Sequence, residues 1–327
     1  MSFDNTKTIA MEALTHYSMT WKSITLIGQS ANTIYKVTDH ENMSYSLRLH
    51  LSRSENFEDI WNKREVIQSE MVWLNALGAD TDIVLPAPIK NKNGAYLTEA
   101  NHVKCTLVQW VEGEQKPFVP TDVDAGYVGT LIGKMHKQSS SWQAPDSFIR
   151  PSFDGSRISQ ALDKIKKLSD AGELDKDHSM KLLEAGQRVI TIMNSIPKTL
   201  GNWGMIHADL IPSNFLFHKH EARPIDFGAC GFGFYLFDLG WTFSYIHPAF
   251  RNRLLESYSQ YYTLPENYIE LLEAFFVAGQ LETMNFWLGL PDFCDWLPKH
   301  IEKLAGREIM FYLNDQRFLF GGTPYWE

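Results

Sequence analysis

The chain has 327 residues, of which 44% are hydrophobic, 21% charged and 13% aromatic. This composition is typical of a folded protein and excludes a disordered tail or a fibre. At roughly 100 to 200 residues per domain, the length predicts two domains, or one large unit built from two lobes.

The charge balance is acidic, with 30 Lys and Arg against 39 Asp and Glu and a formal net charge of -9. Because this field repels phosphate backbones and anionic lipid, we expect neither nucleic acid nor a membrane as a partner. The three cysteines are widely spaced and form no C-x-x-C pair, which fits a reducing compartment. The N-terminus has no secretory pattern and the most apolar stretch is too broken to span a membrane, so we expect a cytoplasmic protein.

The first third of the chain predicts a β-rich lobe with one long helix. Apolar residues over 56–77 share one face at about 100° per residue, which indicates that helix. Turn-forming residues separate the other short apolar runs, and the turn at 39–42 predicts a hairpin. The predicted strands are 23–27, 33–38, 44–49, 83–90, 96–99 and 103–111.

Beyond residue 112 the apolar pattern becomes mainly helical, interrupted by two short strands at 215–217 and 223–225. We therefore divide the chain into lobes 1–112 and 113–327. The predicted class is α+β, with a small β-rich lobe followed by a larger, mainly helical one. The predicted helices are 123–138, 158–171, 179–196 and several beyond 237.

Three polar residues recur at a spacing that suits phosphoryl transfer. An H-x-D motif at 207–209 is followed by Asn214, five residues after Asp209, and then by a D-F-G motif at 226–228. Phosphoryl transfer needs a carboxylate to orient and deprotonate the attacking hydroxyl, and oxygen ligands that hold Mg²⁺ against the nucleotide phosphates. Asp209, Asn214 and Asp226 supply these groups. Each motif alone would equally mark a turn or a helix cap, so their order and spacing carry the prediction.

These motifs resemble those of the aminoglycoside phosphotransferase and choline kinase family, relatives of protein kinases with a bilobal, protein-kinase-like fold. The resemblance covers nearly the whole chain, and alanine inside H-x-D favours the small-molecule branch over protein kinases, which carry H-R-D. It implies Asp209 as the catalytic base, Asn214 and Asp226 as Mg²⁺ ligands, and His207 as an orienting residue behind the loop. It also implies that Asp238 supports the catalytic loop by hydrogen bonding its backbone.

The resemblance assigns nucleotide binding to the lobe 1–112, and catalysis with substrate binding to the lobe 113–327. In the first lobe, the strand, turn and strand at 26–37 take the place of the phosphate-covering loop of kinases. A single glycine in a hairpin is equally an ordinary turn residue, so this signal is weak. The nucleotide contacts implied in this loop are Gly28, Ser30 and Asn32.

Arg48 stands where the family's third strand presents a phosphate-binding lysine, which is a departure from the pattern. Arginine keeps the charge, but its longer planar fork need not place that charge where an ammonium would, and Arg48 also suits a solvated strand residue. In the predicted helix, Glu70 lies on the apolar face and Glu65 faces solvent. Because a buried carboxylate needs a cation to offset its desolvation, we expect Glu70 to pair with Arg48.

Gln109 and Val111 end the last strand of the first lobe, where kinases bind adenine through backbone hydrogen bonds. Such contacts leave no side-chain signature, and a buried strand end explains these residues equally well. Their assignment to the nucleotide therefore rests on position alone.

The sequence predicts an ATP- and Mg²⁺-dependent phosphotransferase that moves the γ-phosphate to a hydroxyl of a small molecule. The acceptor stays open among amino alcohols, amino sugars, aminoglycosides and homoserine-like compounds, with the acidic balance mildly favouring a cationic one. Glu282, Asp292 and Asp295 are candidates for binding an amine, although acidic helix faces usually face water.

Two alternatives remain beside this prediction. One is a bacterial protein Ser/Thr kinase of the stress-response type. The other is a nucleotide-binding pseudokinase with a regulatory role, which Arg48 and the glycine-poor loop favour and the retained set of Asp209, Asn214 and Asp226 opposes. The sequence leaves open the oligomeric state, the choice between ATP and GTP, and the role of the C-terminal tail.

Overall fold

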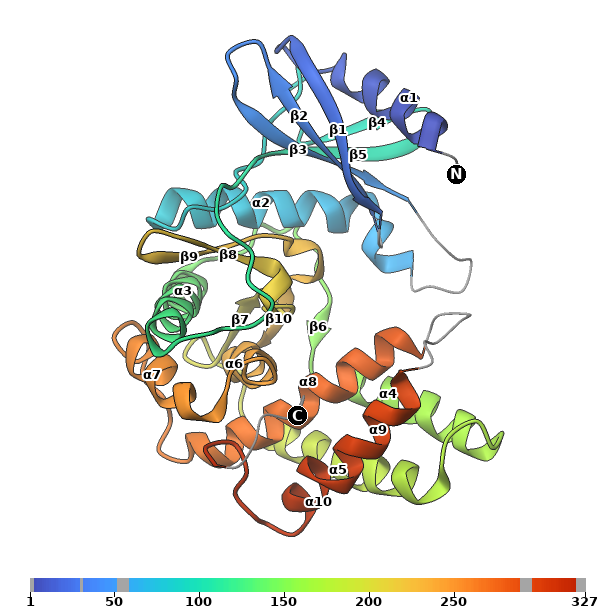
Figure 1. Cartoon of the computed structure of the whole chain (residues 1–327), viewed down its shortest axis with the longest axis vertical. Coiled ribbons are helices and arrows are strands. Elements are labelled where there is room, and N and C mark those ends of the chain that lie inside the picture. The colour runs from blue at the N-terminus through green and yellow to red at the C-terminus, as the bar shows by residue number, and fades with distance from the viewer. Residues whose placement is uncertain (1–2, 30–31, 52–58, 289–295, 322–327) are drawn as a thin grey trace. The chain divides into compact units, whose positions relative to one another are not determined.

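The structure is a computed structural model, and it describes residues 3–29, 32–51, 59–288 and 296–321 (Figure 1). Contacts along the chain divide it into two compact units. The first unit gathers two short segments from far along the chain, and one of these carries the D-F-G motif. It comprises Met1–Gly113, Ala144–Arg150 and Arg223–Gly228, and the second unit comprises Glu114–Gln143, Pro151–Ala222 and Ala229–Glu327.

The first unit is built on a five-stranded antiparallel sheet with the strand order β1-β2-β3-β5-β4. Its long helix is α2 (Arg64–Asp80), preceded by a 3-10 turn, η1 (Asp59–Asn62). The strands are β1 (Trp21–Gln29), β2 (Thr33–Asp39), β3 (Ser44–His50), β4 (Leu97–Ala100) and β5 (Val103–Gln109).

The strand predicted at 83–90 is wrong. Only an isolated bridge between Pro88 and Val108 forms there, flanked by two hydrogen bonds, from the Ile89 amide to the Leu107 carbonyl and from the Gln109 amide to the Ala87 carbonyl. Pro86 and Pro88 have no N–H to donate, so this segment cannot continue a ladder of strand hydrogen bonds.

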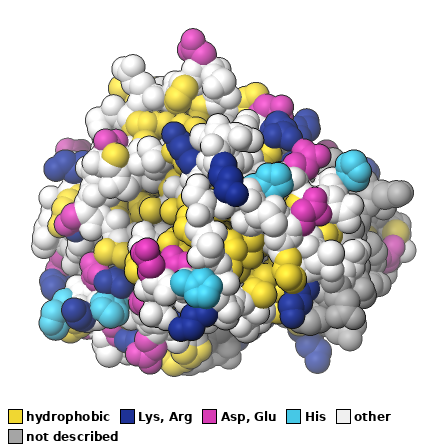
Figure 2. Space-filling model, turned by 90° about the horizontal axis from the view of Figure 1, so that it is seen from above, with side chains coloured by type: hydrophobic (Ala, Val, Ile, Leu, Met, Phe, Trp, Pro, Cys, Tyr) yellow, Lys and Arg dark blue, Asp and Glu magenta, His cyan; other side chains and the backbone are white. Residues whose placement is uncertain are grey.

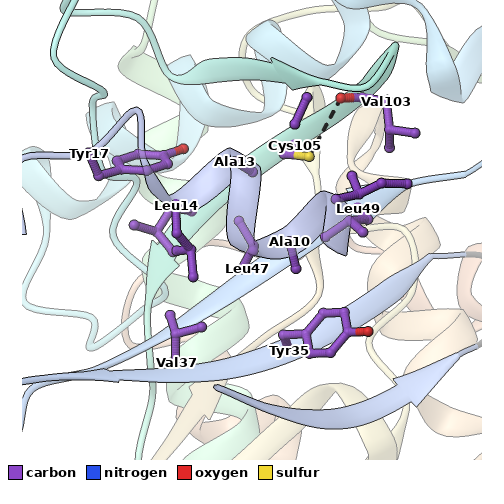
Figure 3. Packing of buried hydrophobic residues seen from close by; sticks show 13 residues of the cluster. Ala10, Ala13, Leu14, Tyr17, Tyr35, Val37, Leu47, Leu49, Val103 and Cys105 are labelled. Carbon is purple, nitrogen blue, oxygen red and sulfur yellow. Dashed lines mark hydrogen bonds between the residues drawn. The ribbon is translucent and has the colours of Figure 1, made fainter. Parts of the chain in front are cut away.

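A shorter helix that the sequence analysis missed, α1 (Phe3–Leu14), covers one face of this sheet (Figure 3). Its apolar positions Ile9, Ala10 and Ala13 follow the helical period and are fully buried. They pack on alternate residues of the strands, among them Leu47 and Leu49 of β3. Because side chains alternate across a strand, Arg48 between these two leucines points to the opposite face.

The second unit is mainly helical. The helices predicted at 123–138, 158–171 and 179–196 are present, and each begins at a residue whose side chain caps it, namely Thr121, Asp154 and Asp175. The helices are α3 (Asp122–Ser141), α4 (Gly155–Asp170), α5 (Lys176–Ser195), α6 (Tyr235–Phe243), α7 (Pro248–Tyr258), α8 (Tyr268–Trp287), α9 (Leu297–Gly306) and α10 (Glu308–Leu313).

Two small sheets accompany these helices. One has the order β6-β10-β7, and its strand β7 ends directly before the H-x-D motif. The other pairs β8 with β9, the two short strands that the sequence predicts near these positions, and the chain returns to the first unit within β9. The strands are β6 (Ser152–Phe153), β7 (Trp203–Ile206), β8 (Phe215–His218), β9 (Glu221–Pro224) and β10 (Gly231–Phe234); the 3-10 turns are η2 (Pro212–Asn214) and η3 (Phe227–Ala229).

Helices α3 and α7 pack with their backbones close together, because a Cβ added at Gly129 would collide with the backbone carbonyl of Leu254. We expect Gly129→Ala to lower the free energy of unfolding by about 3 kcal/mol, since neither backbone can yield. Gly306→Ala is the control: a Cβ there meets nothing within 4 Å, so this change should be neutral or slightly stabilising. Denaturant titration measures both, and an unchanged free energy for Gly129→Ala would contradict the close packing.

None of the helices in the described part of the chain is long and apolar enough to cross a membrane. On the face shown in Figure 2, acidic and basic side chains are interspersed rather than gathered into a field of one sign.

Candidate active site

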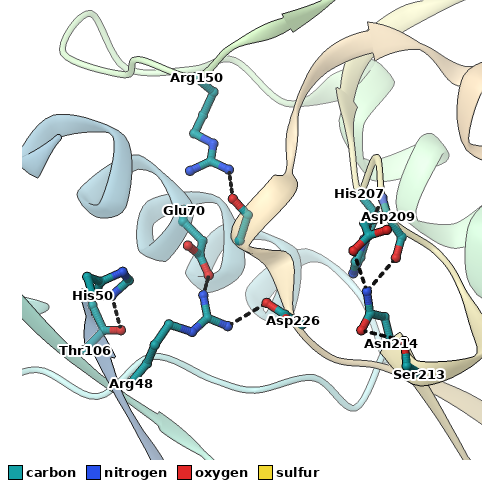
Figure 4. Close-up of polar contacts among 11 residues, drawn as sticks. Arg48, His50, Glu70, Thr106, Arg150, His207, Asp209, Ser213, Asn214 and Asp226 are labelled. Atoms are coloured by element: carbon teal, nitrogen blue, oxygen red, sulfur yellow. Dashed lines mark hydrogen bonds and ion pairs between the residues drawn. The ribbon is translucent and has the colours of Figure 1, made fainter. Parts of the chain in front are cut away.

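Asp209 and Asn214, the predicted catalytic base and a predicted metal ligand, contact each other directly in the second unit (Figure 4). The Asn214 side-chain amide donates to the Asp209 carboxylate at 2.7 Å and to the Asp209 backbone carbonyl at 2.9 Å. Asn214 is buried and Asp209 is partly exposed. The amide therefore fixes the orientation of a carboxylate that solvent can still reach, while the Asn214 oxygen stays on the other side, 3.4 Å from the Ser213 hydroxyl.

The backbone of this loop is strained at Ala208, between His207 and Asp209. Ala208 has a φ of +64°, a left-handed conformation that an alanine rarely adopts. The fully buried Asp238 accepts hydrogen bonds from the amides of His207 at 2.9 Å and Ala208 at 2.7 Å. Hydrogen bonds to an ionised carboxylate are among the stronger ones, so Asp238 stabilises the strained turn.

His207 lies inside the loop that it was predicted to orient. Its ring is fully buried, and its Nδ1 atom lies 3.4 Å from the Asp209 amide nitrogen. His207, Asp209, Asn214 and Asp238 thus form one connected group within the second unit.

A separate group lies in the first unit, where Arg48 contacts two carboxylates through different nitrogens (Figure 4). One terminal nitrogen donates to Glu70 at 2.9 Å and the other to Asp226 at 3.0 Å. The predicted pair of Glu70 with Arg48 is therefore present, and Glu65 is exposed as expected. The Arg48 and Glu70 side chains are 13% and 4% exposed, whereas that of Asp226 is 55% exposed, so Asp226 keeps carboxylate surface for another ligand.

The D-F-G segment is held in place by residues that the sequence analysis did not single out. Arg150 donates to the Gly228 carbonyl at 2.7 Å and to the Val66 carbonyl of α2 at 3.1 Å. The Phe227 ring packs edge-on against Trp73 of α2. No local sequence pattern marks Arg150, because its partners lie about 80 residues away on either side.

Glycine at the end of D-F-G has a steric reason. A Cβ at Gly228 would lie 3.2 Å from an Asp226 carboxylate oxygen and 3.4 Å from an Arg48 terminal nitrogen. Asp226 itself has a φ of +57°. The backbone at Asp226 is therefore strained, and the missing side chain at Gly228 leaves room for the Asp226 carboxylate beside Arg48.

His50, two residues after Arg48 on β3, contacts the Thr106 hydroxyl at 3.0 Å. Burial and the charge of Arg48 hold the pKa of His50 well below 6.5. Below about pH 6.5, His50 therefore binds a proton in the unfolded chain but stays neutral in the folded chain. The stabilising contribution is complete above that pH and is lost as the pH falls below it, by at most about 1.4 kcal/mol per pH unit.

We expect His50→Gln to reduce this loss of stability in acid. The measurement is the free energy of unfolding of wild type and variant between about pH 7 and pH 5. Equal pH dependence in the two proteins would contradict a neutral, buried His50.

The remaining nucleotide candidates are less closely connected. Gly28 of β1 lies opposite Ile34 of β2, and Ile34 in turn lies opposite Arg48 of β3. Asn32 lies directly before β2. Ser30 lies outside the described residues. Gly28 and Arg48 therefore lie in the same row of the sheet, two strands apart, and the phosphate-covering role of this loop stays a prediction.

Gln109 and Val111, the two residues predicted to contact adenine, differ in the hydrogen bonding of their backbone amides. The Gln109 amide already donates to the Ala87 carbonyl at 2.8 Å. Val111 is buried, and within the described ranges its amide has no hydrogen-bond partner. Among the residues that the structure describes, the Val111 amide is thus a donor without a partner, at the strand end where the contact to adenine is predicted.

The acidic candidates for binding an amine are not supported. Glu282 receives hydrogen bonds from Arg157, one of them at 2.8 Å, so its charge already has a cationic partner. Asp292 and Asp295 lie outside the described residues.

Residues 23–273 match the family described as the phosphotransferase enzyme family, which is more than half of the chain. Amicoumacin kinase of Bacillus subtilis (strain 168) is 20% identical over 236 residues, or 71% of this chain. The match covers 65% of that curated relative's length.

Solved structures show the same fold. A microcompartment-associated aminopropanol kinase has a TM-score of 0.76 at 23% identity, covering 96% of this chain and 99% of that one. An amicoumacin kinase in complex with AMP-PNP and Ca²⁺ has a TM-score of 0.73 at 17% identity, covering 99% and 97%. The predicted α+β, protein-kinase-like fold is confirmed, with a β-sheet lobe and a helical lobe. The chain therefore belongs to the phosphotransferase enzyme family.

Proposed function

We propose that the protein is a kinase that moves the γ-phosphate of ATP, with Mg²⁺, to a hydroxyl group of a small molecule. The observation that carries the proposal is the contact between Asp209 and Asn214, in which the Asn214 amide donates to the Asp209 carboxylate at 2.7 Å. Phosphoryl transfer depends on such a positioned carboxylate more than on covalent chemistry, because the protein's main task is orientation and charge stabilisation.

In this proposal Asp209 accepts the proton of the attacking hydroxyl. A general base must reach the proton that it removes, and Asp209 is the partly exposed member of an otherwise buried group. Asn214 holds the carboxylate from one side, and Asp238 holds the backbone through the amides of His207 and Ala208. The loop thus needs little rearrangement before the acceptor hydroxyl arrives.

The proposed metal ligands fit Mg²⁺ by their chemistry. Asn214 offers an amide oxygen, since its nitrogen is used by Asp209, and Asp226 offers a carboxylate that is 55% exposed. Mg²⁺ prefers such hard oxygen ligands and keeps several waters or phosphate oxygens besides. When bound, the ion would neutralise phosphate charge. That an amicoumacin kinase of this fold was solved with AMP-PNP and Ca²⁺ supports nucleotide and divalent-ion use.

The first unit supplies the remaining nucleotide contacts in the proposal, and residues 1–112 would act as the nucleotide-binding lobe. Arg48 carries the phosphate-binding charge on β3, oriented by Glu70. The Val111 amide would donate to the base, because it is buried and has no partner in the described part of the chain. The loop contacts, which keep only their positional support, are Gly28, Ser30, Asn32 and Gln109.

For the acceptor we propose a small alcohol that also carries an amine. The names of the relatives, aminopropanol kinase and amicoumacin kinase, and the net charge of -9 both favour this class. Residues 113–327 would bind it. The proposal includes a cytoplasmic location, with neither nucleic acid nor membrane as a partner.

The test is label transfer from γ-labelled ATP with Mg²⁺ by wild type and Asp209→Asn, offered amino alcohols, amino sugars, aminoglycosides, homoserine and generic protein. Transfer to one small alcohol that the variant loses would support the proposal and name the acceptor class. Label on protein would instead favour the protein-kinase alternative. Tight nucleotide binding without any transfer would favour the pseudokinase, and absence of nucleotide binding would overturn a kinase function.

A further inference from the structure

His136 of α3 connects the buried Asp238 to a third helix. Its Nε2 atom lies 3.2 Å from the Asp238 carboxylate, and its Nδ1 atom lies 3.1 Å from the Tyr258 hydroxyl of α7. All three residues are fully buried. His136 also stacks on the ring of Tyr235, with centroids 4.7 Å apart. The ring is therefore fixed by contacts on both edges and on one face.

The hydrogen atoms in this chain of contacts can be assigned. Ionised Asp238 can only accept, and it already accepts from the amides of His207 and Ala208. His136 must therefore donate from Nε2 to Asp238, and in the tautomer that carries its proton only there, Nδ1 accepts from the Tyr258 hydroxyl. Burial raises the pKa of Tyr258 well above 10, so its hydroxyl keeps the proton that this assignment requires.

This series of hydrogen bonds, from Tyr258 through His136 to Asp238, ends at the strained part of the loop that carries Asp209. Asp238 holds Ala208 in its left-handed conformation directly before Asp209. If His136 is removed, the buried Asp238 carboxylate loses one of its three hydrogen-bond donors, so its position is less firmly fixed. A displaced carboxylate makes poorer hydrogen bonds to the amides of His207 and Ala208. The consequence is a less ordered Asp209.

We propose that His136 and Tyr258 are positioning residues for the catalytic base, acting through Asp238 on the backbone of residues 207–208. The inference rests on the proposed function of Asp209 as that base. His136 touches neither Asp209 nor Asn214 in its described contacts. It sets the loop geometry from behind, and its effect belongs to turnover rather than to substrate binding.

The experiment compares His136→Leu, which removes the donor, with His136→Gln, which keeps an N–H close to the Nε2 position. His136→Leu should lower kcat by about 10- to 100-fold with KM for ATP nearly unchanged, because a small misplacement of a catalytic group costs about this much. His136→Gln should recover most of that loss. Tyr258→Phe should have a smaller effect, since it leaves the bond from His136 to Asp238 in place.

Ser139→Ala is the matched control on the same helix. Ser139 is buried and contacts the Tyr235 hydroxyl at 3.5 Å, but in the described part of the chain it makes no hydrogen bond to His136, Asp238 or residues 207–209, so kcat should stay at the wild-type value. Hydrogen exchange of the His207 and Ala208 amides provides a readout that needs no acceptor. It should accelerate in His136→Leu and return towards wild type in His136→Gln.

Unchanged loop exchange and kcat in His136→Leu would overturn the inference. So would a loss in His136→Gln as large as in His136→Leu with uniformly faster exchange, because that pattern marks a general loss of stability. If wild type transfers phosphate to no acceptor while loop exchange responds as expected, the proposed function fails and the control of the loop by His136 stands.

Discussion

Asp209→Asn is expected to lower kcat for phosphoryl transfer by about 10³-fold or more, while nucleotide affinity changes less than about threefold. An amide cannot take the proton of the attacking hydroxyl. It still presents an oxygen to the Asn214 amide, so the loop should keep its shape. The measurement pairs steady-state kinetics with calorimetric titration of the nucleotide.

Asp175→Asn is a matched control for this change in the same unit. Asp175 caps α5 by accepting from the His178 amide, and asparagine caps helices about as well as aspartate. Its kcat should equal that of wild type. Full activity in Asp209→Asn would contradict the role of Asp209 as the base.

Asp226→Ala is expected to abolish Mg²⁺-dependent nucleotide binding and with it almost all activity. The carboxylate is one of the two proposed protein ligands of the ion, and Mg²⁺ has few protein ligands to lose. The fold should stay nearly intact because the side chain is 55% exposed. Titrating nucleotide affinity against Mg²⁺ concentration measures this effect independently of turnover.

Asp226 also forms an ion pair with Arg48. A second variant must therefore distinguish the loss of this ion pair from the loss of a Mg²⁺ ligand. Asp226→Asn keeps an oxygen that can accept from Arg48 but has no charge for the ion, and we expect it to resemble Asp226→Ala. Asp315→Ala is the matched control: Asp315 has a φ of +55° and pairs with Arg188, yet has no proposed metal. Mg²⁺-dependent binding that survives in Asp226→Ala would show that the metal assignment is wrong.

Local patterns were sufficient wherever one element decided the outcome. The helical period predicted α3, α4 and α5, and it separated Glu70 on the buried face of α2 from the exposed Glu65. The same rule would have found His136, a polar residue on the buried face of α3. The apolar run at 83–90 predicts a strand, but Pro86 and Pro88 lack the N–H donors that a strand needs, so no strand forms there.

The sequence by itself determined the family, through the order and spacing of the H-x-D, Asn214 and D-F-G signals, and the chemistry that these side chains can perform. Only the tertiary structure decided how those side chains are held. Asp226 belongs to the first unit with Arg48, 178 residues earlier, and Asp238 meets His136 from 102 residues away. Such pairs depend on which faces of distant elements pack together, and local periodicity cannot encode that choice.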